Sequence, residues 1–333
     1  MAEGWELFLL NRGSRNGDFA EAPGKAQGKA PGTVREIRCD IKNEDEGEIA
    51  KKLKDYHFDV TADFIAFTPG DTERDFRLFQ DKTEQYLFIS SASAYQKPPA
   101  NYWITESTPL ANPYWQYSRN KIACEDFLLK MYREQGFPVT IVRPSHTYNE
   151  RNVPLGVHGK NGSWQVIKRM LEGKPVIIHG DGTSLWTMTA SVDFAGAFAG
   201  LMGNIHAIGE TVQITSDETL TWNQIYETVA RVLGVPLKAV HISSEFLHQC
   251  SPGYNFLGEL TGDKANSVVF DNSKLKRLVP GFTATVRFDQ GVRRTIEYVL
   301  SHRECQREDP EFDAWCDRVI AARERAIGEI LKG

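Results

Sequence analysis

Hydrophobic positions in the first two thirds of the chain follow two alternating patterns. Short continuous apolar runs predict buried β-strands, whereas apolar residues spaced three or four apart predict amphipathic helices. The expected strands cover residues 6–12, 34–40, 60–67, 86–95, 138–144 and 212–214. The expected helices cover residues 48–54, 117–134 and 190–201. This alternation predicts an α/β fold with a parallel sheet and right-handed crossover connections.

The alternation changes after residue 145. We expect a short helix over 164–172, a short strand over 175–179, a turn at Asp181–Gly182 and a helix over 221–233. Residues 311–331 form a charged amphipathic pattern, which predicts a final helix packed against the body of the protein or against a partner. No internal repeat and no long linker divides the chain into independent units.

Composition narrows the class of protein. The 333 residues are 41% hydrophobic and 25% charged, as is usual for a soluble globular protein, and the formal net charge is −5. This acidic balance makes a nucleic-acid surface an unexpected feature, because such surfaces are normally basic. No apolar run has the length of a membrane span, and no signal-peptide pattern follows Met1, so we expect a cytoplasmic protein without a membrane partner.

Cysteine and histidine spacing gives no sign of a metal site. The five cysteines are scattered, never spaced Cys-x-x-Cys, and odd in number, which favours a reduced compartment. The eight histidines include no His-Glu-x-x-His pair. We therefore expect no bound metal.

The strongest candidate for chemistry is the segment Tyr117-Ser-Arg-Asn-Lys121. On a helix, residues i and i+4 lie on one face, so the phenol of Tyr117 and the ammonium of Lys121 should point the same way. A nearby ammonium favours phenolate, which predicts a lowered pKa for Tyr117 and a role as proton donor or acceptor. Ser91, in the apolar stretch 86–95, could hold the same substrate oxygen, with Ser90 and Ser93 as alternatives.

Four motifs in order carry a family resemblance. They are Ile-Ser-Ser-Ala-Ser-Ala-Tyr at 89–95, the Tyr117 to Lys121 segment, Val-Arg-Pro-Ser at 142–145 and Gly-Asp-Gly-Thr-Ser-Leu-Trp at 180–186. The chain, from about Glu6 to about Val299, resembles extended short-chain dehydrogenase/reductases of the NAD-dependent epimerase/dehydratase family. The resemblance implies a Rossmann-like doubly wound parallel sheet with a smaller C-terminal substrate lobe. It assigns residues 1–144 and about 187–214 to the nucleotide-binding domain, and 145–186 and 215–333 to the substrate lobe.

One family feature is missing from the sequence. Such proteins open with a strand, a Gly-x-x-Gly-x-x-Gly turn and a helix, whose N-terminus holds the cofactor pyrophosphate. Here residues 1–5 look like the end of that helix and 6–12 like the second strand, so the first βα unit is missing. We favour a truncated gene model. The alternatives are a natural form that does not need tight dinucleotide binding, or a strand supplied elsewhere in the chain. The segment Gly24–Gly32 has the wrong spacing for a phosphate loop, and we expect a surface loop there.

The resemblance also implies a dinucleotide cofactor. By position, Asn11 and Arg12 end the second strand, Asp40 meets the adenine, and Ala66 and Phe67 line the cofactor. A basic residue at the end of that strand suits a 2′-phosphate, so Arg12 slightly favours NADP over NAD. The alternatives are a solvated arginine at position 12 and a turn-capping carboxylate at position 40. The family role of Lys121 includes holding the nicotinamide ribose beside Tyr117.

Two departures from family patterns bear on the substrate. Sugar-nucleotide 4,6-dehydratases carry an acidic pair after the catalytic hydroxyl, where this chain has Ala92 and Ser93, which cannot act as carboxylate acids. Sugar-nucleotide epimerases carry Asp-Gly-x-x-x-Arg, and Trp186 replaces that phosphate-binding arginine. We interpret Ser93 and Trp186 as substrate-contacting residues; the alternative for Trp186 is an ordinary core tryptophan. A nucleotide diphosphate sugar is therefore not the expected substrate.

Together these features predict an NAD(P)-dependent oxidoreductase or epimerase acting on a small sugar-like or other polyol substrate. The resemblance also implies a homodimer through the helix of Tyr117, for which Phe127 and Met131 offer a second apolar face. The alternative is a binding or scaffold protein without a functional cofactor site. The chloroplast stem-loop RNA-binding proteins, which the chain also resembles in part, are of that kind.

Overall fold

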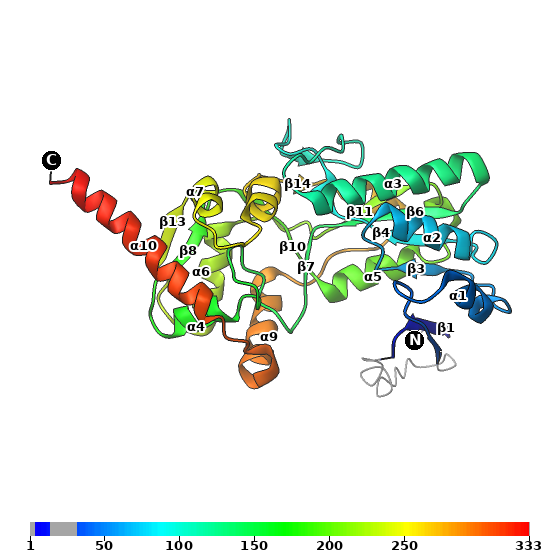
Figure 1. Cartoon of the computed structure of the whole chain (residues 1–333), viewed down its shortest axis with the longest axis horizontal. Helices are drawn as coiled ribbons and strands as arrows, with labels where there is room; N and C mark the ends of the chain where they lie inside the picture. The colour runs from blue at the N-terminus through cyan, green and yellow to red at the C-terminus, as the bar shows by residue number, and fades with distance from the viewer. Residues whose placement is uncertain (1–3, 14–31, 333) are drawn as a thin grey trace.

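The computed structural model describes residues 4–13 and 32–332. The chain forms two lobes arranged along its longest axis (Figure 1). One lobe contains the main parallel sheet and the helices around it, and the other contains most of the C-terminal half of the chain. The last helix, α10 (Pro310–Ile330), extends away from the second lobe to the C-terminus.

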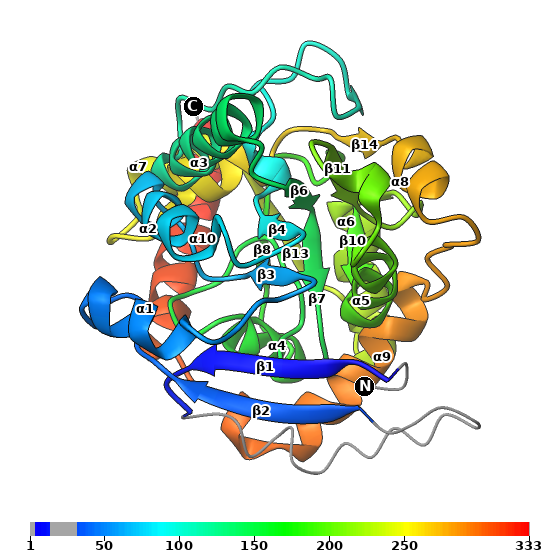
Figure 2. The same cartoon turned by 90° about the vertical axis from the view of Figure 1, so that its right-hand side faces the viewer.

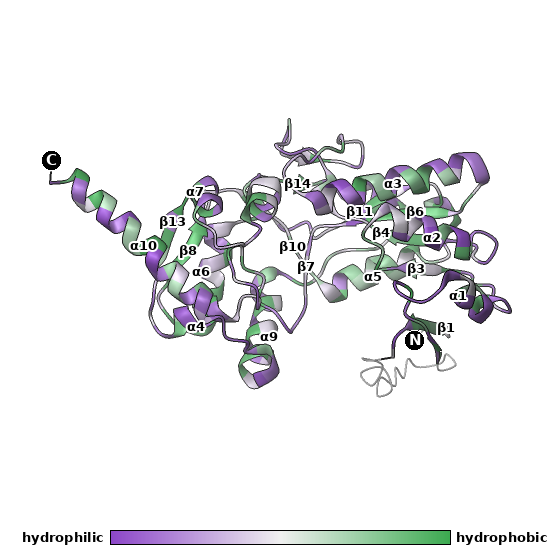
Figure 3. Cartoon of the chain, viewed as in Figure 1, coloured by the Kyte–Doolittle hydropathy of each residue, from purple (hydrophilic) through white to green (hydrophobic). Residues whose placement is uncertain are grey.

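Four parallel strands form the main sheet, in the order β11-β6-β4-β3. In chain order they are β3 (Thr61–Asp63), β4 (Tyr86–Ile89), β6 (Val139–Pro144) and β11 (Thr211–Ile214). Side chains of β4 alternate between the two faces, with Tyr86 and Phe88 in one apolar cluster and Leu87 in another. Burial on both faces explains why these strands read as continuous apolar runs, which Figure 3 shows in green for β4 and β6.

Helices cover both faces of this sheet. On the side of Tyr86 and Phe88 lie α1 (Glu46–Leu53), α2 (Pro69–Phe79) and α3 (Gln116–Gln135), which share one apolar cluster. On the side of Leu87 lie α5 (Ser191–Leu201) and α8 (Ser273–Leu278). The predicted doubly wound, Rossmann-like arrangement is therefore confirmed.

The expected single sheet is divided in two. Strands β1 (Glu6–Asn11) and β2 (Thr33–Arg38) pair in parallel with each other, and within the described residues neither pairs with β3 (Figure 2). Phe8 of β1 rests against Tyr56 and Phe58, with ring centroids 5.2 and 5.6 Å apart. The side chains of β1 are at most half-buried, whereas those of β4 and β6 are almost all buried. The segment Gly24–Gly32, apart from Gly32, lies outside the described residues.

Helix α2 was not expected from periodicity, although its start carries a clear signal. Thr68 is the N-cap, its hydroxyl accepts from the Asp71 backbone N–H, and the Asp71 carboxylate accepts from the Thr68 backbone N–H. Pro69 occupies the first helical position, which suits its fixed φ. The expected strand over 60–67 is correspondingly shorter, because Asp63 accepts from the N–H groups of residues 65 and 66 and turns the chain toward this cap.

The face of α3 that we proposed for dimer contact is already used inside the chain. The ring of Phe127 meets Phe76 of α2 edge-on, with centroids 5.9 Å apart, and Met131 is 7% exposed. These two side chains therefore provide no second apolar face, because α2 covers them. The homodimer itself stays a prediction.

The second lobe has its own apolar cluster, the largest in the described chain. Its helices are α4 (Trp164–Leu171), α6 (Trp222–Leu233), α7 (Ser244–Gln249), the π-helix η4 (Leu257–Lys264), α9 (Phe288–Ser301) and α10. Its parallel pair is β8 (Val176–His179) with β13 (Ala239–Ile242).

The described chain contains three further short strand pairs. They are β7 (His146–Tyr148) with β10 (Met188–Ala190), β9 (Leu185–Trp186) with β12 (Leu220–Thr221), and β5 (Trp103–Ile104) with β14 (Val269–Phe270). Single 3₁₀ turns occur at η2 (Ala92–Ala94), η3 (Ile205–Ala207) and η5 (Arg303–Cys305). The residue boundaries that we proposed for the two domains stay a prediction.

Candidate active site

Tyr117 and Ser91 line the same cavity, which has a volume of about 260 Å³. Tyr117 is the second residue of α3, two positions after the N-cap residue Trp115. Ser91 follows β4 and is the N-cap of the η2 turn. The carboxyl end of a central strand and the start of the next helix therefore bring the two hydroxyls to one site.

Three serine hydroxyls form a chain beside Tyr117. The Oγ atoms of Ser91 and Ser93 are 2.9 Å apart, and Ser118 Oγ donates to Ser93 Oγ at 2.8 Å. The Ser90 hydroxyl instead donates to Glu125, on the opposite side of the backbone. Ser91 and Ser93 thus share a side of the backbone. Because β4 ends at Ile89, the η2 turn and not the alternation of a strand brings their hydroxyls together.

Lys121 is buried one helical turn after Tyr117. Its ammonium donates to the carbonyl oxygens of Ala66 at 2.7 Å and Ile89 at 2.6 Å, at the ends of two neighbouring segments of the sheet. It also lies 4.6 Å from the centroid of the Phe67 ring. Ala66 and Phe67 are thus beside Tyr117 and Lys121, and the Phe67 and Tyr117 rings are 6.3 Å apart. Burial lowers the pKa of Lys121.

The expected lowering of the pKa of Tyr117 is wrong for this structure. Burial raises the pKa of Tyr117, the Ser91 hydroxyl lowers it by hydrogen bonding, and the charge of Asp263 raises it. The Lys121 ammonium is 6.0 Å from the Tyr117 ring centroid and is bound to two carbonyls, so it does not act directly on the phenol oxygen. The spacing of Tyr117 and Lys121 in the sequence predicted that they share a helix face, but it could not predict the hydrogen bonds of Lys121 to two backbone carbonyls.

Asn11, Arg12 and Asp40 gather at the end of the β1–β2 pair. Asn11 Oδ1 accepts from the Gly13 N–H at 2.7 Å. Asp40 accepts from Asn43 Nδ2 at 3.0 Å, which together with the Arg12 charge and backbone N–H groups lowers the pKa of Asp40. Asp40 therefore does stabilise its own turn, and the charge of Arg12 acts on it.

The N-terminus of α1, the helix that follows Asp40 in the chain, is a poor site for an anion. Asp45 caps α1 and accepts from the N–H groups of Gly47 and Glu48, and the first turn carries Glu46 and Glu48. These carboxylates oppose a pyrophosphate at that position.

Trp186 belongs both to the core and to the cavity. It is 3% exposed, its Nε1 donates to His146 Nδ1 at 3.4 Å, and its ring lies 5.6 Å from that of Trp222. It nevertheless lines the cavity that contains Ser91 and Tyr117. Trp186 is therefore a core residue that also lines the cavity, and its contact with a substrate stays a prediction.

Several wall residues carried no signal in the sequence. Lys97, His146 and Asp263 line the same cavity, together with Trp115 and Phe270. They come from an irregular loop, the connector β7, the π-helix and β14, which no local motif links to Tyr117. Trp115 is there because it is the N-cap of α3, whereas Asp263 and Phe270 reach the cavity through the packing of the second lobe.

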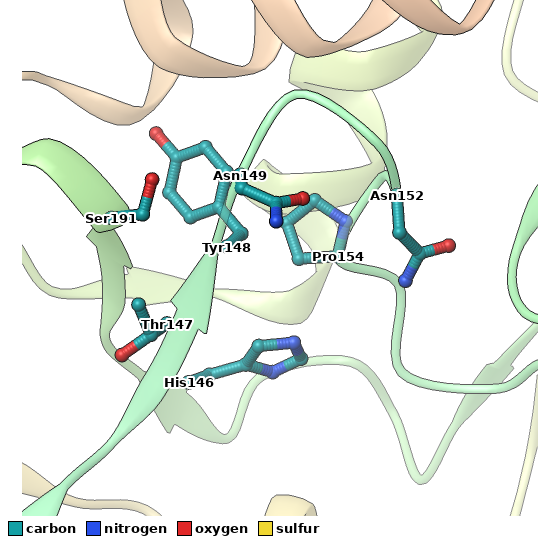
Figure 4. Close-up of a pocket in the computed structure, with 7 residues that line it drawn as sticks. All are labelled: His146, Thr147, Tyr148, Asn149, Asn152, Pro154 and Ser191. Atoms are coloured by element: carbon teal, nitrogen blue, oxygen red, sulfur yellow. The ribbon is translucent and has the colours of Figure 1, made fainter. Parts of the chain in front are cut away.

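A second, smaller cavity of about 140 Å³ adjoins the first through His146 (Figure 4). Polar side chains of Thr147, Asn149, Asn152 and Ser191 line it. Burial lowers the pKa of His146 to about 3, so its ring is neutral at physiological pH. The hydroxyl of Tyr148 has no hydrogen-bond partner within residues 4–13 and 32–332.

Two features are absent from the described part of the chain. Its His, Cys, Asp and Glu side chains form no group of three or more that could hold a metal ion. Its helices include none that is both long and apolar enough to cross a membrane.

Comparison with known proteins gives relatives of several activities. A 2′-dehydrokanamycin reductase of Streptomyces kanamyceticus is 27% identical over 199 residues, which are 60% of this chain and 54% of the reductase. An uncharacterized UDP-glucose epimerase of Bacillus subtilis is 28% identical over 220 residues, 66% of this chain and 61% of the epimerase. The chain thus spans little more than half the length of these curated relatives.

Solved structures share the fold. The epimerase Mth375 of Methanothermobacter thermautotrophicus has a TM-score of 0.69 at 14% identity, covering 91% of this chain and 94% of that chain. A dTDP-glucose 4,6-dehydratase of Bacillus anthracis in complex with NAD has a TM-score of 0.68 at 17% identity, covering 90% and 89%. At these identities the likeness establishes the fold alone.

A family model covers most of the chain. The model described as the NAD dependent epimerase/dehydratase family matches residues 1–214. This range includes both strands of the β1–β2 pair, the whole main sheet, and Ser91, Tyr117 and Lys121. The chain belongs to the NAD dependent epimerase/dehydratase family.

Proposed function

We propose that this protein is an NAD(P)-dependent oxidoreductase or epimerase that acts on a carbinol or carbonyl carbon of a small sugar-like or other polyol substrate. One observation carries the proposal: Tyr117 and Ser91 present their side chains to one cavity, with the buried Lys121 one turn further along α3. Family membership supports redox chemistry at such a carbon.

Tyr117 is the proton donor in this proposal. Because burial raises its pKa, the phenol is neutral at physiological pH and can give its proton to a carbonyl oxygen. Ser91 can donate a hydrogen bond to the same oxygen. Lys121 is bound to two backbone carbonyls, so we assign it to holding the start of α3 and the nicotinamide ribose rather than to the phenol oxygen.

In this proposal, the described residues contact a nicotinamide dinucleotide only at its nicotinamide end and at its adenine end. A nicotinamide dinucleotide supplies or accepts the hydride when bound. Tyr117 and Lys121 would hold the nicotinamide ribose. Asn11, Arg12 and Asp40 would meet the adenine side, with exposed Arg12 slightly favouring NADP. Between these ends the described residues offer no anion site, and the acidic start of α1 is unsuitable.

Trp186 supports a substrate without a diphosphate. An indole cannot make the bidentate charged contacts that an arginine makes with phosphate, and no arginine lines the cavity among the described residues. Of the relatives, one is named for reduction of a kanamycin derivative and others for UDP-sugars. The cavity wall favours the first kind of substrate, which carries no nucleotide.

A second candidate function is binding without turnover. Within the described residues, the separation of β1–β2 from β3 supports it, because the dinucleotide site of this fold lies where those strands meet. The acidic net charge does not favour RNA as the ligand. For either function we expect a cytoplasmic homodimer.

The test is the Tyr117→Phe variant, assayed with millimolar NADP or NAD against unphosphorylated hexoses and cyclitols, with UDP-glucose for comparison. We expect turnover to fall by about 10²–10⁴, the usual contribution of a positioned acid or base. The matched control is Tyr132→Phe, which removes a hydroxyl from the exposed end of the same helix. If the Tyr117→Phe and Tyr132→Phe variants have the same turnover rate, Tyr117 is not the proton donor. If no substrate is turned over by the unaltered protein, the binding role is favoured.

A further inference from the structure

The cavity wall contains a buried ion pair, Lys97–Asp263, whose charged atoms lie further apart than those of the buried pair Arg143–Glu125. Lys97 Nζ and Asp263 Oδ1 are 3.6 Å apart, and the Lys97 side chain is 2% exposed. Both residues line the cavity of Ser91 and Tyr117. In the part of the chain that the structure describes, neither the Lys97 ammonium nor the Asp263 carboxylate forms an ion pair or hydrogen bond with a third side chain, although the charges of Lys264 and Glu259 also act on Asp263.

The buried pair Arg143–Glu125 shows what a structural ion pair looks like in this protein. Arg143 Nε donates to both carboxylate oxygens of Glu125, at 2.9 and 3.2 Å, and the Ser90 hydroxyl donates to the same carboxylate. Neither residue lines the cavity. Buried charges are normally saturated in this way, because unused hydrogen-bonding capacity is costly to desolvate. The loose, unsaturated Lys97–Asp263 pair is the exception.

The backbone holds this pair in fixed register with the catalytic candidates. Asn112 Nδ2 donates to the Ser93 carbonyl at 2.8 Å and to the Gly262 carbonyl at 2.7 Å, so one amide joins the η2 turn to the residue before Asp263. The Lys97 backbone N–H donates to the Ala111 carbonyl at 2.8 Å, next to Asn112. The pair is therefore built into the site.

We propose that Lys97 and Asp263 are specificity-determining residues that bind two adjacent hydroxyl groups of an unphosphorylated sugar or cyclitol. An ammonium can only donate and a carboxylate can only accept, so two neighbouring hydroxyls satisfy both. A phosphate would be repelled by Asp263 and an isolated amine by Lys97. The rings of Trp115, Trp186 and Phe270 supply the apolar wall for the carbon face of the same ring. This inference rests on the proposed function for the reacting carbon, but it concerns binding at a different part of the substrate.

The pair also bears on Tyr117. The charge of Asp263 contributes to the raised pKa of Tyr117, which agrees with a position near the phenol. Burial raises the pKa of Asp263 and lowers that of Lys97, while each partner's charge opposes the shift of the other.

The experiment measures binding, separately from turnover. Methyl β-D-glucopyranoside and its monodeoxy analogues are titrated into the full chain, with quenching of tryptophan fluorescence as the signal, since two tryptophans line the cavity. We expect removal of either contacted hydroxyl to weaken binding about tenfold, a change of ~1.4 kcal/mol. Lys97→Met and Asp263→Asn should bind the parent glycoside about tenfold more weakly and should lose discrimination against the deoxy analogues.

A structural role would change affinity for all ligands equally, so discrimination is the deciding readout. Lys168→Met, which breaks a surface ion pair with Glu308, is the control and should behave as the unaltered protein. The proposal is overturned if Lys97→Met and Asp263→Asn keep the original discrimination, or if only UDP-glucose binds. Tyr117→Phe should keep glycoside binding and discrimination. Should that variant also keep turnover, the proposed proton donor fails while the binding result still decides the role of the pair.

Discussion

The two sides of the candidate site are built very differently. Around Tyr117 the chain is tightly fixed, because Lys121 ties α3 to two segments of the sheet and serine hydroxyls join the η2 turn to α3. Around Arg12 and Asp40 the site rests on two half-buried strands that pair only with each other among the described strands. The proposed proton-transfer site therefore depends on the main sheet, whereas the proposed dinucleotide contacts depend on strands that pack less closely against the rest of the protein.

The largest contrast should appear in stability. Leu128 is fully buried in α3 against the main sheet, whereas Leu10 of β1 is only partly buried. We expect Leu128→Ala to lower the free energy of unfolding by about 2–5 kcal/mol, because it leaves a cavity in a packed core. Leu10→Ala should cost about 1 kcal/mol or less, since part of its surface is already in water.

Urea denaturation followed by circular dichroism measures both variants. Equal losses for Leu128→Ala and Leu10→Ala would mean that β1 is as firmly packed as the main sheet. Amide hydrogen exchange provides an independent check, in which the β1–β2 pair should exchange faster than β4 and β6.

The pH dependence of turnover should reflect the raised pKa of Tyr117. Oxidation of a carbinol needs the phenolate, which is the minor form at every pH below that pKa. The rate of oxidation should therefore rise about tenfold per pH unit between about pH 7 and 9, while reduction, which uses the abundant phenol, stays nearly flat.

This prediction is checked by measuring kcat/KM in both directions over that range. An oxidation rate independent of pH would show that Tyr117 already ionises near neutrality when the site is filled. Asp263→Asn removes a charge that raises the pKa of Tyr117, so it should move the rising limb to lower pH.

A smaller effect is expected on cofactor preference. Arg12→Glu replaces the exposed cation beside Asp40 with an anion, which should disfavour a 2′-phosphate. The preference for NADP over NAD should fall by about tenfold, as is typical for one charged contact. Arg38→Glu, at the end of neighbouring β2, is the control for a change of surface charge. An unchanged ratio for Arg12→Glu would mean that Arg12 is a solvated surface residue.

Sequence patterns predicted the central sheet well because its strands are buried on both faces. The expected helix over 117–134 and the observed α3 (Gln116–Gln135) differ by one residue at each end. Helix α2 was missed because its apolar residues do not form a simple stripe, although Thr68 and Pro69 mark its start. The division of the sheet beside β3 is a tertiary feature that no local pattern could show.

The candidate site was predicted only where it lies on local structure. Ser91, Tyr117 and Lys121 belong to one strand–helix unit, so spacing was enough to place them together. Lys97 and Asp263 meet through the packing of the second lobe, and neither lies in a recognisable motif. The bonds of Lys121 to backbone carbonyls were also invisible in the sequence, as was the burial of Tyr117 that raises its pKa.

The most direct test of this contrast is a calorimetric titration of the 333-residue protein with NADP and with NAD. The proposed contacts lie only at the two ends of the cofactor, and the start of α1 is capped by Asp45 and carries Glu46 and Glu48, which oppose a pyrophosphate there. Losing several charge-assisted hydrogen bonds should weaken affinity at least about a hundredfold, which predicts dissociation constants near ~1 mM. Micromolar binding of either dinucleotide would contradict the account, because another segment would then supply the phosphate site.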